Sequence, residues 1–510
     1  MSEPLNILVL IVDQMQSFSL GANGNPDVKT PNIDRLAAEG ANFNRAYCNN
    51  PVCMPSRATL LTGLTPKQHG CFTNGTNLPE HIPTLPQVLA RHGYRTHAAG
   101  KLHHQSYMSP ANPIDPERPW SMEDNRKWKN GEIAKLPENY YGYQSADFIG
   151  GHIDVWGEYA QEMERKQPGF MKKYSEAGAY YSHPEAPMCY RIDVPEELHY
   201  NRWIADHSIA FMKDCQSSGQ PFFEWCSFPD PHFPFVASNP YSEMYDPASL
   251  SLPDNWEQKN DMLEHLVAYR NMPQYQQAGH FTESALREII AQTYGAITHV
   301  DTEIGRMVNF LEQSGLLPHT LIIFMADHGE YLGSHHLLTK GEWPWEEGVR
   351  VPYIWRDPQG SQALGRTHGH VVSLLDFVPT VLEYAGIDQR EMDTRGFRHS
   401  QPLGLPGRSL YPFLRDGRPL PDLPAYIEYD EDWLPASMCR MRAIVTGQYK
   451  LAIFALVHEG ILIDLERDPH ETRNLWDDPQ YQHIRAELTE QLLMELARTG
   501  RLDLPRITGA

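Results

Sequence analysis

Two short apolar segments and one long amphipathic segment dominate the pattern of hydrophobic positions along the chain. Residues 7–12 and 321–326 are uninterrupted apolar runs, and runs of this length are typical of strands buried on both faces. Between 284 and 315, apolar residues recur at helical spacing, which predicts a long helix with one buried face. The first hundred residues also alternate strand-like and helix-like segments, which predicts a mainly parallel sheet sandwiched by helices. Its further expected elements are helices over 33–40, 56–63 and 82–92 and a strand over 94–99.

The C-terminal part of the chain has a different pattern. A Pro- and Gly-rich stretch from 402 to 421 leads into three short strand-like segments and a final amphipathic segment (441–445, 449–454, 460–464 and 481–498). These predict a smaller antiparallel sheet with one packed helix. We therefore expect a large α/β domain over 1–415 and a small α+β domain over 416–510. Within the first, residues 105–196 are rich in Trp, Tyr, Pro and charge, and we interpret them as an insertion that shapes a pocket.

Polar side chains directly follow both apolar strands. Asp13 and Gln14 follow the first strand, and Asp327 and His328 follow the second. Because ligands gather at the carboxyl ends of the strands in open α/β sheets, we expect these four residues to form one site. Two carboxylates, an amide oxygen and an imidazole suit a hard divalent cation, and the imidazole leaves a transition ion such as manganese open. Either pair alone is also common as a loop cap.

Charge and cysteine content narrow the classes of partner and compartment. The 65 acidic residues outnumber the 43 basic ones, for a formal net charge of -22, which argues against a nucleic-acid or anionic-membrane partner. The first apolar run is followed at once by Asp13, which is unlike a signal peptide, and no stretch is long enough to span a bilayer. We therefore expect a cytoplasmic protein. Its seven cysteines lack zinc-site spacing, which favours reduced, mostly structural thiols.

One cysteine lies in a specific motif. The stretch Cys53-Met54-Pro55-Ser56-Arg57 is followed by Leu60-Leu61-Thr62-Gly63, and it resembles the signature of the sulfatase family, in the alkaline phosphatase superfamily. The resemblance implies that a formylglycine-generating enzyme oxidises Cys53 to formylglycine, whose hydrate is the nucleophile. The site is physically suitable, because a helix N-terminus favours an anion and Arg57 adds a permanent cation. A buried free cysteine before a helix is the alternative interpretation.

Further segments resemble the same family, in family order and over nearly the whole chain. Gly93-Tyr94-Arg95-Thr96 with Gly100-Lys101-Leu102-His103 is one block, and Pro231-His232-Phe233-Pro234 is another. The resemblance implies that Arg57, Lys101 and Lys340 neutralise the sulfate oxygens. His103 would act as a base on the nucleophile, and His232, with Lys340, as an acid toward the leaving alcohol. At spacing two, Lys101 and His103 would project from the same side of an extended segment. By the same resemblance, Asn74 would contact the substrate.

Departures from the family pattern leave the substrate open. Many sulfatases have Asp-Asp and Asp-Asn where this chain has Asp13-Gln14 and Asp327-His328, and the latter combination also resembles phosphonate monoester hydrolases. We expect hydrolysis of sulfate monoesters, small anionic substrates, with one divalent metal held by residues 13, 14, 53, 327 and 328. Calcium is the family's usual metal. The alternatives are a phosphonate monoester or phosphate diester hydrolase, a cysteine hydrolase with Cys53 as thiol nucleophile, and a non-catalytic anion-binding protein. Self-association is compatible with such a chain, although no segment predicts an interface.

Overall fold

The structure is a computed structural model, and it describes most of the chain. The described residues are 4–108, 121–258, 281–360, 364–392, 404–431 and 439–500, apart from residues 187, 456 and 458. Among them, no helix is long and apolar enough to cross a membrane.

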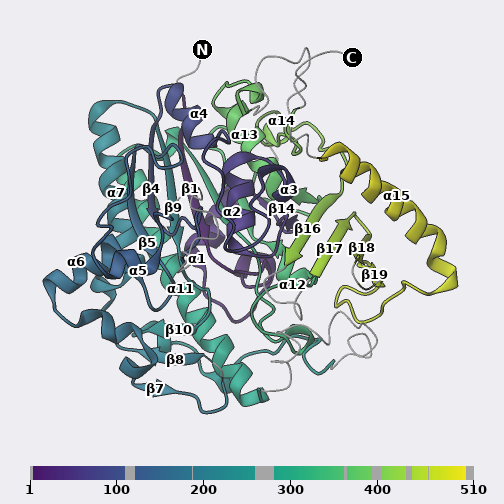
Figure 1. Cartoon of the computed structure of the whole chain (residues 1–510), viewed down its shortest axis with the longest axis horizontal. Coiled ribbons are helices and arrows are strands. Elements are labelled where there is room, and N and C mark those ends of the chain that lie inside the picture. Colours follow the sequence, from purple (N-terminus) through teal and green to yellow (C-terminus); the bar gives the residue numbers. More distant parts are fainter. Residues whose placement is uncertain are drawn as a thin grey trace.

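A nine-stranded sheet forms the centre of the molecule (Figure 1), in the order β14-β2-β13-β11-β1-β9-β4-β5-β6. The pairs from β11 to β5 are all parallel, whereas β13 and β6 are antiparallel to their neighbours. The α/β fold class predicted from the sequence is thus confirmed. The strands span β1 (Asn6–Val12), β2 (Ala41–Phe43), β4 (Arg95–Gly100), β5 (Ser145–Gly150), β6 (Trp156–Gly157), β9 (Phe222–Phe228), β11 (Thr320–Ala326), β13 (Tyr353–Arg356) and β14 (Arg366–His368).

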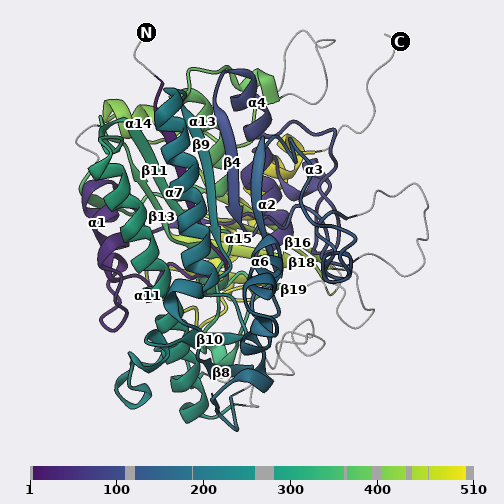
Figure 2. The same cartoon turned by 90° about the vertical axis from the view of Figure 1, so that its left-hand side faces the viewer.

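Helices cover both faces of this sheet. Figures 1 and 2 show α7 on one side of the central strands and α2 on the other. Helices α7, α11 and α1 form one layer, and α2, α4 and α13 lie on the opposite side. The helices span α1 (Pro31–Glu39), α2 (Cys53–Thr62), α4 (Leu85–Arg91), α7 (Tyr200–Ser218), α11 (Glu283–Gln313) and α13 (Phe377–Tyr384).

The starts of α2 and α4 each differ from the sequence prediction by three residues. Helix α4 begins at Leu85 because Thr84 caps it, with its hydroxyl accepting from the backbone N–H of Gln87. Helix α2 begins at Cys53, three residues earlier than predicted. The first turn of a helix tolerates Pro55, because the N–H groups there have no partner within the helix. Cys53 is therefore the first helical residue.

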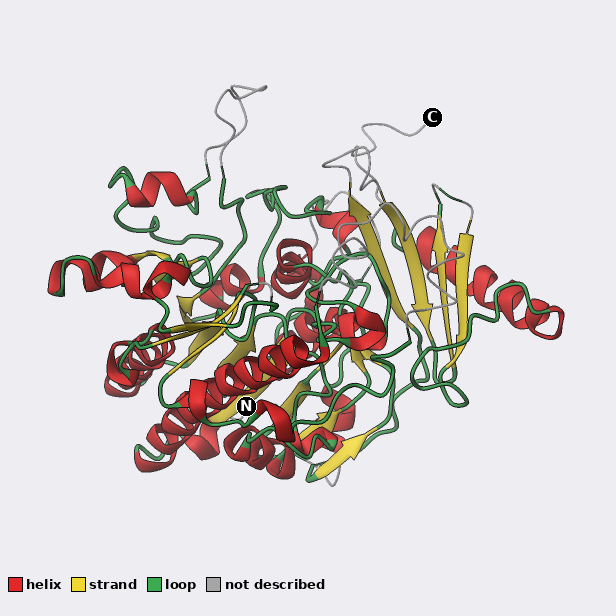
Figure 3. Cartoon of the chain, turned by 90° about the horizontal axis from the view of Figure 1, so that it is seen from below, coloured by secondary structure: helices red, strands yellow, loops and turns green. Residues whose placement is uncertain are grey.

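The C-terminal region forms the expected antiparallel sheet, with four strands in the order β16-β17-β18-β19, of which β16 was not predicted. Its strands and helix span β16 (Ala425–Glu431), β17 (Cys439–Val445), β18 (Tyr449–Phe454), β19 (Glu459–Asp464) and α15 (Gln482–Arg498). Helix α15 packs on this sheet through Leu488 and Leu492, and Figure 3 shows both at one side of the molecule. Residues 105–196 contribute β5 and β6 to the edge of the main sheet, so part of this segment belongs to the central layer.

Candidate active site

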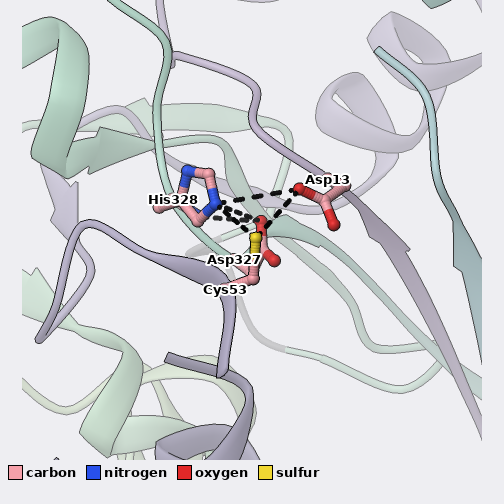
Figure 4. A group of neighbouring side chains, drawn as sticks. All are labelled: Asp13, Cys53, Asp327 and His328. Atoms are coloured by element: carbon pink, nitrogen blue, oxygen red, sulfur yellow. Dashed lines mark hydrogen bonds and ion pairs between the residues drawn. The ribbon is translucent and has the colours of Figure 1, made fainter. Parts of the chain in front are cut away.

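The site forms where β1 and β11 end side by side. Val12 pairs with Ala326 in the parallel register, so Asp13 and Asp327 emerge next to each other. With Cys53 and His328 they form a buried group whose ligand atoms all lie within 4.8 Å of one another. Figure 4 shows the four side chains converging. Two carboxylates, an imidazole and a sulfur fit a divalent cation, so the donor set is compatible with the metal expected from the sequence.

Helix α2 presents Cys53 to this group from its first residue. The Cys53 sulfur lies 3.2 Å from Nε2 of His328 and 3.6 Å from Oδ1 of Asp13. The other imidazole nitrogen of His328, Nδ1, lies 2.9 Å from the carbonyl oxygen of Gly329. Because a carbonyl only accepts, Nδ1 carries a proton, and Nε2 is the nitrogen that faces the site.

Arg57 lies behind the carboxylates, with a fully buried guanidinium. Its Nε donates to Asp327 at 2.7 Å, and a terminal nitrogen donates to Asp13 at 3.0 Å. The other terminal nitrogen is bonded to the carbonyl of Lys101 and the hydroxyl of Ser227. Arg57 thus holds the two carboxylates together. These bonds direct the guanidinium of Arg57 at Asp13 and Asp327. The contact between Arg57 and the substrate that the resemblance implies stays a prediction.

Gln14 is held by hydrogen bonds at both ends of its amide. Its Nε2 donates to Glu330, and its Oε1 accepts from Nζ of Lys340 at 2.7 Å. The backbone at Gln14 has φ 60°, and its N–H donates to Asp327 at 3.1 Å. The amide oxygen is thereby turned to the side of the site where Lys340 lies. Its role as a metal ligand stays a prediction.

Two lysine ammonium groups approach the Cys53 sulfur. Nζ of Lys340 lies 3.3 Å from it and Nζ of Lys101 lies 3.7 Å from it. Lys101 also forms a buried ion pair with Asp13. Burial and Asp13 raise the pKa of the Cys53 thiol, but Lys101, Lys340 and His328 outweigh them and lower it overall. The position that Cys53 occupies therefore stabilises a negatively charged nucleophile.

Two stacked histidines lie within hydrogen-bond distance of these lysines. The rings of His232 and His152 are 3.4 Å apart and nearly parallel, at 3°. Nε2 of His232 is bonded to Lys340, and Nε2 of His152 lies 3.3 Å from Nζ of Lys101. The sequence reasoning missed His152. Its signal was a polar residue just after a strand, one position later than at Asp13, but β5 lies in a segment of weak periodicity.

The position of His103 differs from the sequence expectation. The expected extended segment is wrong at this residue, because His103 has φ 55° and the chain turns there. Its ring stacks on that of Tyr107, with 3.8 Å between the ring centroids. The ammonium of Lys101, in contrast, approaches the Cys53 sulfur. Burial and Lys101 lower the pKa of His103, so its imidazole is neutral. That state suits the expected base.

Asn74 is exposed beside the start of α2. Its side-chain oxygen accepts from the backbone N–H of Met54 at 3.0 Å, so it supports the first turn of the helix that carries Cys53. The expected contact between Asn74 and the substrate stays a prediction.

Comparison with known proteins identifies the family. A sulfatase family model matches residues 5–387. The chain belongs to the sulfatase family, within the alkaline phosphatase superfamily, and its class is sulfuric ester hydrolase. A second model, for the C-terminal region of N-sulphoglucosamine sulphohydrolase, matches residues 333–498.

Individual members of this superfamily match this sulfatase over nearly its whole length. An arylsulfatase of Clostridium perfringens is 30% identical, over 96% of this chain and 94% of its own. A multifunctional alkaline phosphatase superfamily protein of Trinickia caryophylli, PehA, is 28% identical over the same shares. The phosphonate monoester hydrolase of Agrobacterium radiobacter has a TM-score of 0.78 at 26% identity, covering 97% of this chain and 96% of its own.

Proposed function

We propose that this sulfatase hydrolyses sulfate monoesters, of aryl or small alkyl type, with residue 53 as formylglycine and one divalent metal. The observation that carries the proposal is the approach of both Lys101 and Lys340 to the Cys53 sulfur. In an enclosed site, fixed ammonium groups stabilise charge on the transferred group far more than water does. The 30% identity with an arylsulfatase supports sulfur as the target.

The residues around position 53 supply orientation and charge. Asp13, Asp327 and His328 would hold the metal, which as a Lewis acid would lower the pKa of the nucleophile. The carboxylates and Gln14 suit calcium, and the imidazole leaves manganese open. Arg57 keeps Asp13 and Asp327 in place, while Lys101 and Lys340 neutralise the oxygens of the sulfate group.

Leaving-group chemistry falls to the pair of Lys340 and His232. Nδ1 of His232 faces the carbonyl of Phe233 and must donate to it, so Nε2 accepts from Lys340. Burial, His152 and Lys340 lower the pKa of His232, and the ring is neutral. Lys340 is then the N–H donor of the pair, and His232 orients it toward the leaving oxygen. The sequence suggested that His232 is the acid, whereas here His232 orients Lys340, which donates the proton.

A phosphonate monoester or phosphate diester hydrolase is the second candidate. Gln14 and His328 at the two strand ends favour it. So does the similarity to phosphonate monoester hydrolases, one of which, from Silicibacter pomeroyi, has a TM-score of 0.80 at 25% identity over 99% of this chain. These substrates also carry one negative charge, which the same lysines would neutralise.

Two measurements test the proposal. Turnover of 4-nitrophenyl sulfate and of a phenyl phosphonate monoester is compared with the same purified enzyme, and dominance of the phosphonate overturns the choice of sulfur. Mass spectrometry of the peptide containing Cys53 shows whether the thiol has become an aldehyde. An unmodified thiol in fully active enzyme would instead support a cysteine nucleophile, and an unmodified thiol without turnover a binding protein.

A further inference from the structure

His152 lies two residues after the end of β5, at the same carboxyl edge of the sheet as the rest of the site. Its Nε2 is 3.3 Å from Nζ of Lys101. A lysine ammonium has three donors and no acceptor, so Nε2 must accept. The proton of His152 is therefore on Nδ1, which is buried and without a hydrogen-bond partner among the described residues. The ring is fixed in one tautomer by Lys101.

His152 and His232 form two equivalent histidine–lysine pairs, and their rings stack on each other. Each of the two parallel rings accepts from one lysine, His152 from Lys101 and His232 from Lys340. Both lysines in turn reach the Cys53 sulfur. The two stacked histidines thus fix the direction of both ammonium groups, although the lysines come from segments far apart in the sequence.

Lys101 has one strong contact besides His152. Its ion pair is with Asp13, which also binds Arg57. A lysine side chain has many rotamers, so a single carboxylate contact leaves its ammonium free to rotate about Asp13. The acceptor on His152 restricts that motion.

We propose that His152 is a positioning residue, which holds the ammonium of Lys101 against the group that residue 53 presents to the substrate. The role rests on the proposed function insofar as residue 53 is the nucleophile. It does not depend on whether sulfur or phosphorus is attacked. His152 acts through Lys101 on the transferred group, and not through His232 on the leaving group.

The test compares His152→Ala and His152→Gln, whose amide oxygen can replace Nε2 as an acceptor. His152→Ala should lower kcat about 10- to 100-fold, as is usual when the partner of a site residue is removed, with KM changed less than about threefold. His152→Gln should recover kcat to within about fivefold of the parent. The control is His299→Ala, which removes another buried ring, stacked on Tyr241 at 4.4 Å. It should leave kcat unchanged.

A series of aryl esters with phenols of different pKa separates the two lysines. The loss in His152→Ala should be the same for every leaving group, because Lys101 acts on the transferred group. A loss that grows with the pKa of the phenol would place His152 on the leaving-group side and overturn the proposal. So would an unchanged kcat, or a His152→Gln variant as impaired as His152→Ala while its thermal unfolding midpoint matches the parent. If phosphonate esters dominate turnover, the series is run with them, so a wrong substrate and a wrong role for His152 give different results.

Discussion

The ammonium of Lys340 lies 3.3 Å from the sulfur of Cys53. Because this contact places a fixed positive charge at the reacting position, Lys340→Ala should lower kcat about 100- to 1000-fold. Steady-state kinetics with an aryl sulfate measures the loss. Lys166→Ala is the control, since Lys166 is exposed and pairs with Glu162 on its own helix. A Lys340→Ala enzyme within twofold of the parent would exclude this role.

Arg57 should matter for folding as well as for activity. Replacing it by Met leaves the carboxylates of Asp13 and Asp327 buried without their common partner, which should cost about 3–5 kcal/mol in the free energy of unfolding. A divalent cation would neutralise the same carboxylates, so it should raise the thermal unfolding midpoint more in Arg57→Met than in the parent. Urea unfolding with and without metal checks both effects. Equal stabilisation of the variant and the parent by metal would contradict the role of Arg57 as the partner of the two carboxylates.

Glu330 orients the amide of Gln14, so its hydrogen-bond acceptors should matter although the residue is outside the group of candidate metal ligands. It accepts from Gln14, from the N–H of Leu332 and from that of Thr339. Glu330→Gln places an NH2 group against one of these donors, which should cost about 1–3 kcal/mol and lower kcat about tenfold. Glu312→Gln, at an exposed glutamate, is the matched control. An unchanged kcat in Glu330→Gln would show that the orientation of Gln14 is irrelevant.

Metal removal should abolish turnover reversibly. Dialysis against a chelator takes away the charge that the carboxylates hold, and added calcium or manganese should restore activity. Because imidazole is a better ligand for manganese than for calcium, His328→Asn should weaken the activation constant for manganese more than that for calcium. Metal analysis and titration of activity measure both. Full activity after exhaustive chelation would rule out the metal.

The ion pairs of His97 with two carboxylates in the sheet should make stability depend on pH above neutrality. His97 contacts Glu224 at 2.8 Å and Asp147 at 3.2 Å. Burial lowers the pKa of His97, but the two carboxylates outweigh it and raise it from 6.5 to about 9. A raised folded-state pKa means that this stabilisation is complete below pH 6.5 and is lost as the pH rises through 9. Its size is about 3 kcal/mol.

His97→Gln tests this dependence. The variant should be less stable than the parent at pH 6, and the difference in unfolding free energy should shrink toward pH 10. Denaturant unfolding at several pH values measures it. The same difference at pH 6 and pH 10 would contradict the pKa of His97.

The sequence predicted the parts of the site that follow local rules. Asp13 and Asp327 could be paired because polar residues after buried parallel strands meet at one edge. Cys53 could be placed at the start of a helix from its motif and from the glycine that ends the helix. The main sheet and the C-terminal sheet followed from periodicity in the same way.

The remaining parts depend on tertiary geometry that no local pattern encodes. The direction of the Arg57 guanidinium is set by two carboxylates about 45 and 270 residues away in sequence. The turn at His103 comes from a positive φ that sequence spacing does not indicate. His152 follows a strand in an aromatic segment without clear alternation, so its position at the end of β5 was not visible.

The loop before Cys53 is hydrogen-bonded to β16, a strand of the C-terminal sheet. The side chains of Asn49 and Asn50 donate to the carbonyls of Tyr426 and Glu428 in β16, at 2.7 and 2.9 Å. During synthesis, β16 leaves the ribosome several hundred residues after Cys53, roughly 20 to 80 s later at ordinary elongation rates. In the finished fold Cys53 is only 1% exposed. If residue 53 is converted to formylglycine, the converting enzyme would therefore have a limited period, which closes when the C-terminal sheet docks.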